Sequence, residues 1–253
     1  MAMIEIQRWY LNNRLRNYNY LIVNITTKTA IAIDPLSALM VQDQLKRQDL
    51  TLEAILLTHD HGDHIAGVES LIAETNALVY GNGVVPNVTI ESLQHDQQLS
   101  LKTATCQAIL VPGHKSTHVA FWVDQAHLFC GDTLFNAGVG NTKDPSASVE
   151  ALYHSVLYLR DSLPETTKIY PAHDYFENNL AFACQVAPDP TYYKQWYQKV
   201  ANQTAEDKPI TTLADEKQMN IFLQVDMPVW QSTYKTFDPL VIFKQLRSQK
   251  DAF

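Results

Sequence analysis

One short stretch constrains this chain more than any other. It is THDHGDH, residues 58–64, with three histidines and two aspartates around one glycine. It follows LEAILL at 52–57, an apolar run that predicts a buried strand. In an extended segment residues two apart point the same way, so His59 and His61 can converge on one cation. Asp63 and His64 begin the next helix and point to a second position. The motif therefore predicts a metal centre rather than a polar surface loop.

One segment cannot complete two metal sites, so further ligands must come from elsewhere in the chain. Three polar side chains share the same context, a position directly after a predicted strand: His114 in VPGH, Asp132 in GDTL and His173 in YPAH. Ligand sites of α/β proteins usually gather at such strand ends. Imidazole and carboxylate ligands without a thiolate suit zinc, iron, manganese or cobalt.

Apolar periodicity predicts strands and helices in alternation over the first 175 residues. The predicted strands are 4–8, 18–25, 30–34, 52–58, 78–80, 107–111, 119–123, 127–130 and 168–170. The predicted helices of this part are 36–47, one that starts near Asp63, and 149–163. This order fits two sheets with helices on their outer faces. Helical patterns then dominate at 176–186, 191–204, 213–222 and 239–249. We expect an α/β body, residues 1–175, and a helical domain, residues 176–253.

Composition narrows the class of protein further. The net charge of −8 argues against a nucleic-acid partner, which usually meets a basic face. The three cysteines are far apart in sequence and form no CxxC pair, so we interpret them as free thiols of a protein in a reducing compartment. The chain shows neither the run of about 20 apolar residues of a membrane span nor the apolar core of a secretion signal. We expect a cytoplasmic monomer that binds neither membrane nor nucleic acid.

The motifs in this order resemble the metallo-β-lactamase superfamily. The resemblance rests on Asp34 after its strand, THDHGDH, PGH at 112–114, GDTLF at 131–135 and His173. It implies an αββα sandwich that holds two divalent ions, for which we expect zinc, with iron or manganese as alternatives. It implies that one ion is bound by His59, His61 and His114, and the other by Asp63, His64 and His173. Asp132 matches the carboxylate that bridges the two ions.

Within the superfamily the chain is most similar to glyoxalase II, the hydroxyacylglutathione hydrolases. The segments that carry this likeness are HDYFENNLAFACQVAPD at 173–189, TTLADEKQMNIF at 211–222 and RSQKDAF at 247–253. It implies a C-terminal helical substrate-binding domain and a glutathione thioester substrate, with Tyr175, Arg247 and Lys250 at positions that contact glutathione. Cations suit that polyanionic peptide. The loop GVGNTKD at 138–144 departs from the family pattern, and there Lys143 is expected to supply the displaced charge.

The resemblance implies hydrolysis by a hydroxide that bridges the metals, oriented by Asp63 and Asp132. Asp34 is expected to brace a metal-bound histidine, and His118 to have a supporting role. Two alternatives share the fold: a glutathione persulfide dioxygenase with a single iron, and a lactonase. The long helical C-terminus argues against the dioxygenase.

Overall fold

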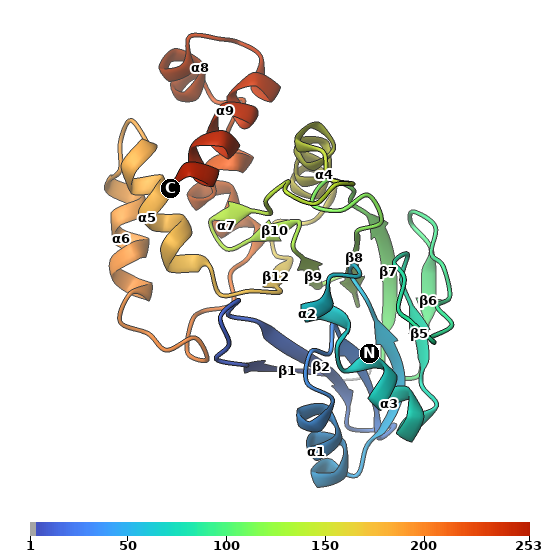
Figure 1. The fold of residues 1–253 in the computed structure, drawn as a ribbon. Helices are drawn as coiled ribbons and strands as arrows, with labels where there is room; N and C mark the ends of the chain where they lie inside the picture. Colours follow the sequence, from blue (N-terminus) through green and yellow to red (C-terminus); the bar gives the residue numbers. More distant parts are fainter. Residues whose placement is uncertain (1–3) are drawn as a thin grey trace. The chain divides into compact units, whose positions relative to one another are not determined.

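The computed structural model describes residues 4–253, which form two compact units (Figure 1). Unit 1 comprises residues 4–110 and Thr117–Gly131. Unit 2 comprises Val111–Ser116 and Asp132–Phe253. The boundaries between the units thus fall inside the predicted α/β body, residues 1–175. Each unit contains some of the predicted metal ligands.

Unit 1 contains a mixed five-stranded sheet in the order β1-β2-β3-β4-β5. Its strands are β1 (Ile4–Tyr10), β2 (Tyr18–Asn24), β3 (Thr29–Ile33), β4 (Thr51–Leu56) and β5 (Leu78–Tyr80). The first three are antiparallel, whereas β3, β4 and β5 run parallel. Every residue of β2 and β3 is buried, and the two buried asparagines of β2, Asn19 and Asn24, donate to backbone carbonyls. THDHGDH follows β4 in sequence, and because β3, β4 and β5 run parallel it lies at the edge of the sheet where all three strands end.

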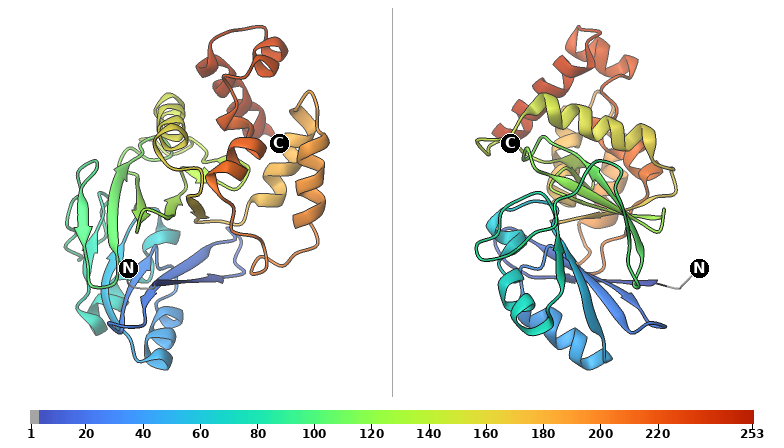
Figure 2. Two further views of the ribbon diagram at one scale, coloured as in Figure 1. Left: turned by 180° about the vertical axis from the view of Figure 1, so that it is seen from behind. Right: turned by 90° about the vertical axis from the view of Figure 1, so that its right-hand side faces the viewer.

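A second set of strands in unit 1 is antiparallel: β6 (Gln98–Ser100), β7 (Thr105–Leu110), β8 (Val119–Val123) and β9 (His127–Gly131). It packs against the first sheet, since the rings of Tyr20 and Phe129 lie 5.4 Å apart. Helices α1 (Ala38–Gln48) and α3 (Val68–Thr75) lie beside the first sheet (Figure 2). The apolar side chains of these helices, such as Val41 and Leu71, pack in one core with every second residue of β2 and β3, such as Leu21 and Ala30.

The helix predicted to start near Asp63 is divided in the structure. A short α2 (Gly62–Ile65) precedes α3, with a break at Gly67. The backbone of Gly67 lies against the α1 entry, where its N–H donates to Pro35 O (2.8 Å). A Cβ at this position would lie 2.4 Å from the same oxygen. The apolar period continues through both helices, so sequence periodicity alone did not reveal the break.

Unit 2 is mainly helical. Its elements are the hairpin β10 (Leu134–Phe135) and β11 (Gly138–Val139), α4 (Val149–Ser162), β12 (Lys168–Pro171), α5 (Phe176–Val186), α6 (Thr191–Val200), α7 (Leu213–Met219), the 3-10 helix η1 (Ile221–Leu223), α8 (Pro228–Tyr234) and α9 (Pro239–Ala252). Helices α5 and α6 lie side by side in both views (Figure 2), around a core that includes Phe176, Leu180 and Val200. Among residues 4–253, none of the helices has the length and apolar character that crossing a membrane requires.

Most predicted elements appear within two residues of their expected ends, and α5 matches exactly. The helix predicted over 213–222 is instead α7 followed by η1. Asn220 separates them, because its side chain accepts a hydrogen bond from Phe222 N (3.2 Å) and so caps the new turn. The predicted helix 191–204 ends at Val200. The sequence did not predict β6, β10, β11 or α8, which are short and lack a clear period.

Candidate active site

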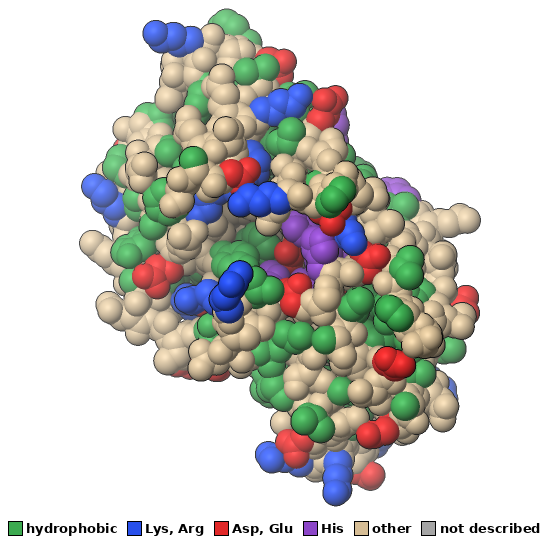
Figure 3. Space-filling model, in the orientation of Figure 1, with side chains coloured by type: hydrophobic (Ala, Val, Ile, Leu, Met, Phe, Trp, Pro, Cys, Tyr) green, Lys and Arg blue, Asp and Glu red, His purple; other side chains and the backbone are tan. Residues whose placement is uncertain are grey.

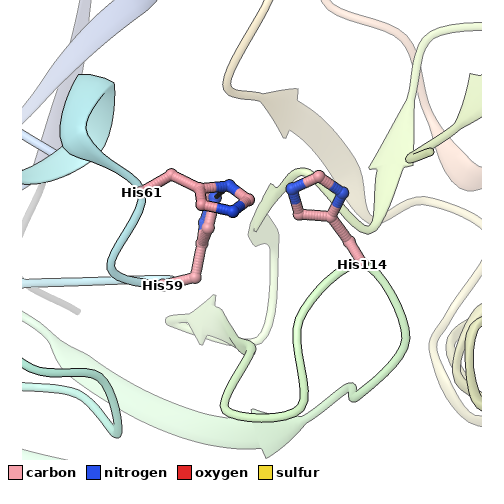
Figure 4. A group of neighbouring side chains, drawn as sticks. All are labelled: His59, His61 and His114. Carbon is pink, nitrogen blue, oxygen red and sulfur yellow. Dashed lines mark hydrogen bonds between the residues drawn. The ribbon is translucent and has the colours of Figure 1, made fainter. Parts of the chain in front are cut away.

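His59 and His61 lie on the loop that joins β4 to α2 (Figure 4). Nε2 of His59 is 2.9 Å from Nδ1 of His61, and the two rings meet edge to face. Ligand atoms that share one zinc ion at about 2 Å lie roughly 3 Å apart. The local backbone therefore brings these two side chains to the spacing that a single cation requires, as the alternation of an extended segment predicts.

Asp34 organises the base of this loop. Its carboxylate accepts hydrogen bonds from the N–H (2.7 Å) and hydroxyl (2.6 Å) of Thr58, and from Nδ1 of His64 (2.9 Å). The bond from His64 keeps the proton on Nδ1, which leaves Nε2 as the ligand atom. Asp34 adopts a left-handed φ of 44°, a strained conformation that is typical of functional sites. The expected contact between Asp34 and a motif histidine is present.

The two aspartates of the motif point to different places. Asp63 lies beside His64, with Oδ2 3.4 Å from Nε2, and Asn17 donates a 2.9 Å hydrogen bond to the same Oδ2. Asp60 instead accepts from Val84 N (2.8 Å) in another loop. His118 stacks on the His59 ring, with 4.8 Å between ring centroids. Asn17 was not singled out in the sequence, because nothing near it marks a ligand contact.

In unit 2 the three downstream residues form a cluster of their own. Oδ2 of Asp132 lies 3.5 Å from Nε2 of His114, and Oδ1 lies 3.1 Å from Nε2 of His173. All three residues are buried. Each carboxylate oxygen thus faces a different imidazole, which is the arrangement that a carboxylate shared by two cations needs. Asp132 is 18 positions after His114 and 41 positions before His173 in the sequence. All three follow strands, which is why the sequence predicted that they would meet.

Two features fix the His114 ring. Gly113 has a φ of +151°, and a Cβ there would lie 2.3 Å from Leu152 Cα, so the VPGH turn can pack on α4 only with glycine. Nδ1 of His114 donates to the carbonyl of Asn141 (2.8 Å). That bond again leaves Nε2, the nitrogen that faces Asp132, as the ligand atom.

The residues predicted to contact substrate all lie in unit 2. The Tyr175 ring stacks on His173, with centroids 5.0 Å apart. Lys143 is exposed, and its backbone N–H donates to Asn141 Oδ1 (3.1 Å). Lys250 is half-buried, with Nζ bonded to Asn178 and lying over the Phe253 ring. Burial, with a smaller contribution from Arg247, lowers the pKa of Lys250 to about 8.

Arg247 differs from the other predicted contacts, because it is buried and bonded to the chain itself. Its Nη1 donates to the carbonyls of Val139 (3.0 Å) and Gly140 (3.2 Å), and its Nη2 pairs with Asp251 (2.9 Å). Its contact with substrate stays a prediction. On the face drawn in Figure 3, basic and acidic side chains are interspersed, so anion binding has to be argued from single side chains.

Two buried carboxylates beside these residues were missed. Asp174, next to His173, accepts from Lys208 Nζ with both oxygens (2.9 and 2.8 Å). Glu216 is fully buried and accepts from Ala137 N (2.8 Å) and the Thr211 hydroxyl (2.8 Å). Burial raises the pKa of Glu216 to about 7. The capping-box sequence around Thr212 and Asp215 marks only the start of α7, so nothing in the sequence set Glu216 apart from an exposed helical glutamate.

Two family models match the chain. The model of the metallo-beta-lactamase superfamily matches residues 13–103, and that of the hydroxyacylglutathione hydrolase C-terminus matches residues 174–253. A hydroxyacylglutathione hydrolase from Francisella tularensis subsp. tularensis (strain WY96-3418) is 43% identical over 227 residues, which cover 87% of this chain and 88% of the relative. The relative from Francisella philomiragia subsp. philomiragia (strain ATCC 25017) is 42% identical over the same shares.

Solved structures show the same fold. ETHE1 from Myxococcus xanthus matches with a TM-score of 0.65 and 25% identity, over 85% of this chain and 83% of that one. TTHA1623, solved in a di-iron-bound form, matches with a TM-score of 0.63 and 25% identity, over 86% and 100%. The expected α/β sandwich with a C-terminal helical domain is confirmed, and the histidine and aspartate clusters are of the kind that binds divalent metal. Both the match to the C-terminal family model and the identity to the relatives show that the chain belongs to the hydroxyacylglutathione hydrolase (glyoxalase II) family of the metallo-β-lactamase superfamily.

Proposed function

We propose that this protein hydrolyses a glutathione thioester of the S-lactoylglutathione type to glutathione and a hydroxy acid. The observation that carries the proposal is the coincidence of two features in one chain. The histidine and aspartate clusters have ligand geometry, and the hydroxyacylglutathione hydrolase C-terminal model matches residues 174–253. We further propose that the protein is monomeric and that it is cytoplasmic, the latter in line with its widely spaced cysteines.

Two divalent ions, zinc in preference to iron or manganese, are proposed as cofactors. The residues that would hold the first are His59, His61 and His114, and those that would hold the second are Asp63, His64 and His173, with Asp132 shared. The fit is supported by the paired nitrogens of His59 and His61, and by the two oxygens of Asp132, each directed at a different histidine. The related TTHA1623 has been solved with two irons. The oxygen and imidazole set accepts any of these metals.

Bound at this site, divalent ions would supply an activated water and polarise the thioester carbonyl. The protein's own part is positioning. The carboxylates of Asp63 and Asp132 would orient the water, with Asn17 holding the first of them through Oδ2. Asp34 and the Asn141 carbonyl keep protons on Nδ1 of His64 and His114, which leaves both Nε2 atoms basic. Glutathione thiolate is a stable leaving group, so the chain needs no strong general acid.

The test is a substrate panel measured on protein of known metal content. The panel contains S-lactoylglutathione, other glutathione thioesters, glutathione persulfide and lactones. We expect thioester hydrolysis to exceed the other reactions and to disappear with metal removal. Oxygen consumption with glutathione persulfide would instead identify the dioxygenase alternative, and thioesterase activity that survives metal removal would reject the mechanism.

The bond from His64 to Asp34 gives a prediction for metal binding. In Asp34→Asn an amide nitrogen replaces one oxygen of a carboxylate that accepts from three donors. One donor is then left facing another donor, and His64 loses its orientation. We expect the metal dissociation constant, measured by chelator competition, to rise about 10- to 100-fold. An unchanged dissociation constant would show that Asp34 does not support a ligand.

Lys250 gives a prediction for substrate affinity. Since its pKa is lowered to about 8, its positive charge is present below that pH and is lost as the pH rises through it. If Lys250 binds an anionic group of glutathione, KM should rise about 10-fold between pH 7 and 9, the size of one charge-assisted hydrogen bond. Arginine stays charged over this range. In Lys250→Arg the rise should be absent, and identical profiles for both proteins would contradict the assignment.

A further inference from the structure

Three consecutive residues, Val139 to Asn141, line the His114 and Asp132 cluster. We call them the 139–141 strip. The carbonyl of Asn141 accepts from Nδ1 of His114 (2.8 Å). The N–H of Gly140 donates to Thr133 O (3.3 Å), next to Asp132. A Cβ on Gly140 would lie 1.9 Å from Asp132 O and 3.2 Å from His114 Cβ, so the strip is in direct contact with both cluster residues. The position of the strip therefore determines the positions of His114 and Asp132.

Arg247, on α9, holds this same strip more than 100 residues further along the chain. Its Nη1 donates to two successive carbonyls, Val139 O and Gly140 O, immediately before the carbonyl that holds His114. The guanidinium is fixed in turn by Asp251 one turn along α9 and lies over the Phe222 ring, 5.6 Å from its centroid. A planar guanidinium clamped in this way has little freedom to move.

The burial of Arg247 distinguishes it from Lys250, three residues away on the same helix. Arg247 is only 5% exposed, and both of its terminal nitrogens are already bonded within the protein. These bonds use three of the five N–H donors of the guanidinium, and the burial of the side chain leaves little of it open to a substrate carboxylate. Lys250 is more exposed, and it bonds Asn178 rather than the 139–141 strip. The two cations therefore have different partners, although the family likeness gives them one role.

The geometry points to Arg247 as a positioning residue for the metal site. It fixes the 139–141 strip, and through the Asn141 carbonyl it fixes the tautomer and the ring orientation of His114. Ligand geometry must hold within about 0.5 Å for full affinity, and removal of an outer-shell partner typically lowers metal affinity about 10- to 100-fold. The inference rests on the proposed role of His114 as a metal ligand.

The experiment compares Arg247→Met, which keeps an apolar stem but no donor, with Lys250→Met as the matched control. The first readout is the dissociation constant for Zn²⁺, from chelator competition without substrate. We expect it to rise about 10-fold in Arg247→Met and to stay at the wild-type value in Lys250→Met. Arg247→Lys, which can still donate to the two carbonyls, should recover part of the affinity. It also serves as the second variant should Arg247→Met not fold.

The second readout is solvent exchange of the His114 Nδ1 proton, followed by NMR in metal-free protein and identified by its absence in His114→Gln. Faster exchange in the Arg247 variants than in Lys250→Met supports the inference, even if the wild-type protein proves not to bind zinc and the proposed function fails. Unchanged zinc affinity and unchanged exchange, with KM alone raised for a glutathione thioester, would overturn it and return Arg247 to substrate binding.

Discussion

Replacement of Asp132 by alanine is expected to abolish thioester hydrolysis together with metal binding. The two oxygens of Asp132 face two different cluster histidines, His114 and His173. Loss of an outer-shell partner already costs about 10- to 100-fold in metal affinity or activity, so loss of a shared ligand should cost more than about 100-fold. The measurements are kcat/KM on S-lactoylglutathione and the metal content of the purified protein.

A matched control for Asp132 is Asp43→Ala. Asp43 is exposed on α1 and pairs with Arg47 on the same helix. A surface pair of this kind contributes between about 0 and 1 kcal/mol, so activity and metal content should stay at wild-type values. If Asp132→Ala keeps its metal but loses activity, Asp132 acts on the water or substrate and is not a ligand. If it keeps both, the proposed site is wrong.

Glu216→Ala is expected to destabilise the fold strongly. Glu216 is fully buried and accepts four hydrogen bonds, from the Ala137 N–H and from the side chains of Thr211, Asn136 and Asn220. Ala137 has a left-handed φ of 56°, a conformation that alanine adopts only at a cost. With the carboxylate removed, these donors are buried without an acceptor, each at about 1 to 3 kcal/mol. We expect the free energy of unfolding in urea to fall by about 3 kcal/mol or more.

The same residue gives a pH dependence of stability. Burial raises the pKa of Glu216 from its ordinary 4.5 to about 7, so between these values the folded protein binds a proton that the unfolded chain releases. The contribution of Glu216 to stability is therefore full below pH 4.5 and is lost as the pH rises through 7, at up to about 1.4 kcal/mol per pH unit.

Glu216→Gln cannot titrate, so it isolates this contribution. We expect the wild-type protein to lose stability relative to Glu216→Gln as the pH rises from 5 to 7.5, measured by urea unfolding at each pH. A constant difference between the two proteins across this range would mean that Glu216 keeps an ordinary pKa in the folded state.

Much of the site follows from local rules that act over a few residues. Alternation along an extended segment is enough to direct His59 and His61 the same way and Asp60 another way. The position of His114, Asp132 and His173 after apolar strands is enough to predict that they cluster, because strand ends meet at one edge of a sheet. The family likeness then supplied the substrate class, which spacing alone could not.

Other elements could not be predicted because their signals are weak or shared. The two-residue strands β10 and β11 are too short to show a period, although β11 ends at Val139, the first residue of the 139–141 strip. The division of α2 from α3 at Gly67 depends on the approach of the Pro35 carbonyl, which lies more than 30 residues earlier. Both features are set by packing against distant backbone, which leaves no trace in local periodicity.

The sequence by itself determined which residue types could bind metal and at which strand ends they stand, because backbone alternation and apolar runs are local properties. Only the tertiary structure decided what surrounds them. Glu216 reaches Asn136 across 80 residues, and Arg247 reaches Val139 across 108. In sequence they are an ordinary helical glutamate and one more cation near the C-terminus. Burial and the partners they meet depend on how distant segments pack, so their roles at the hairpin arise only in the folded chain.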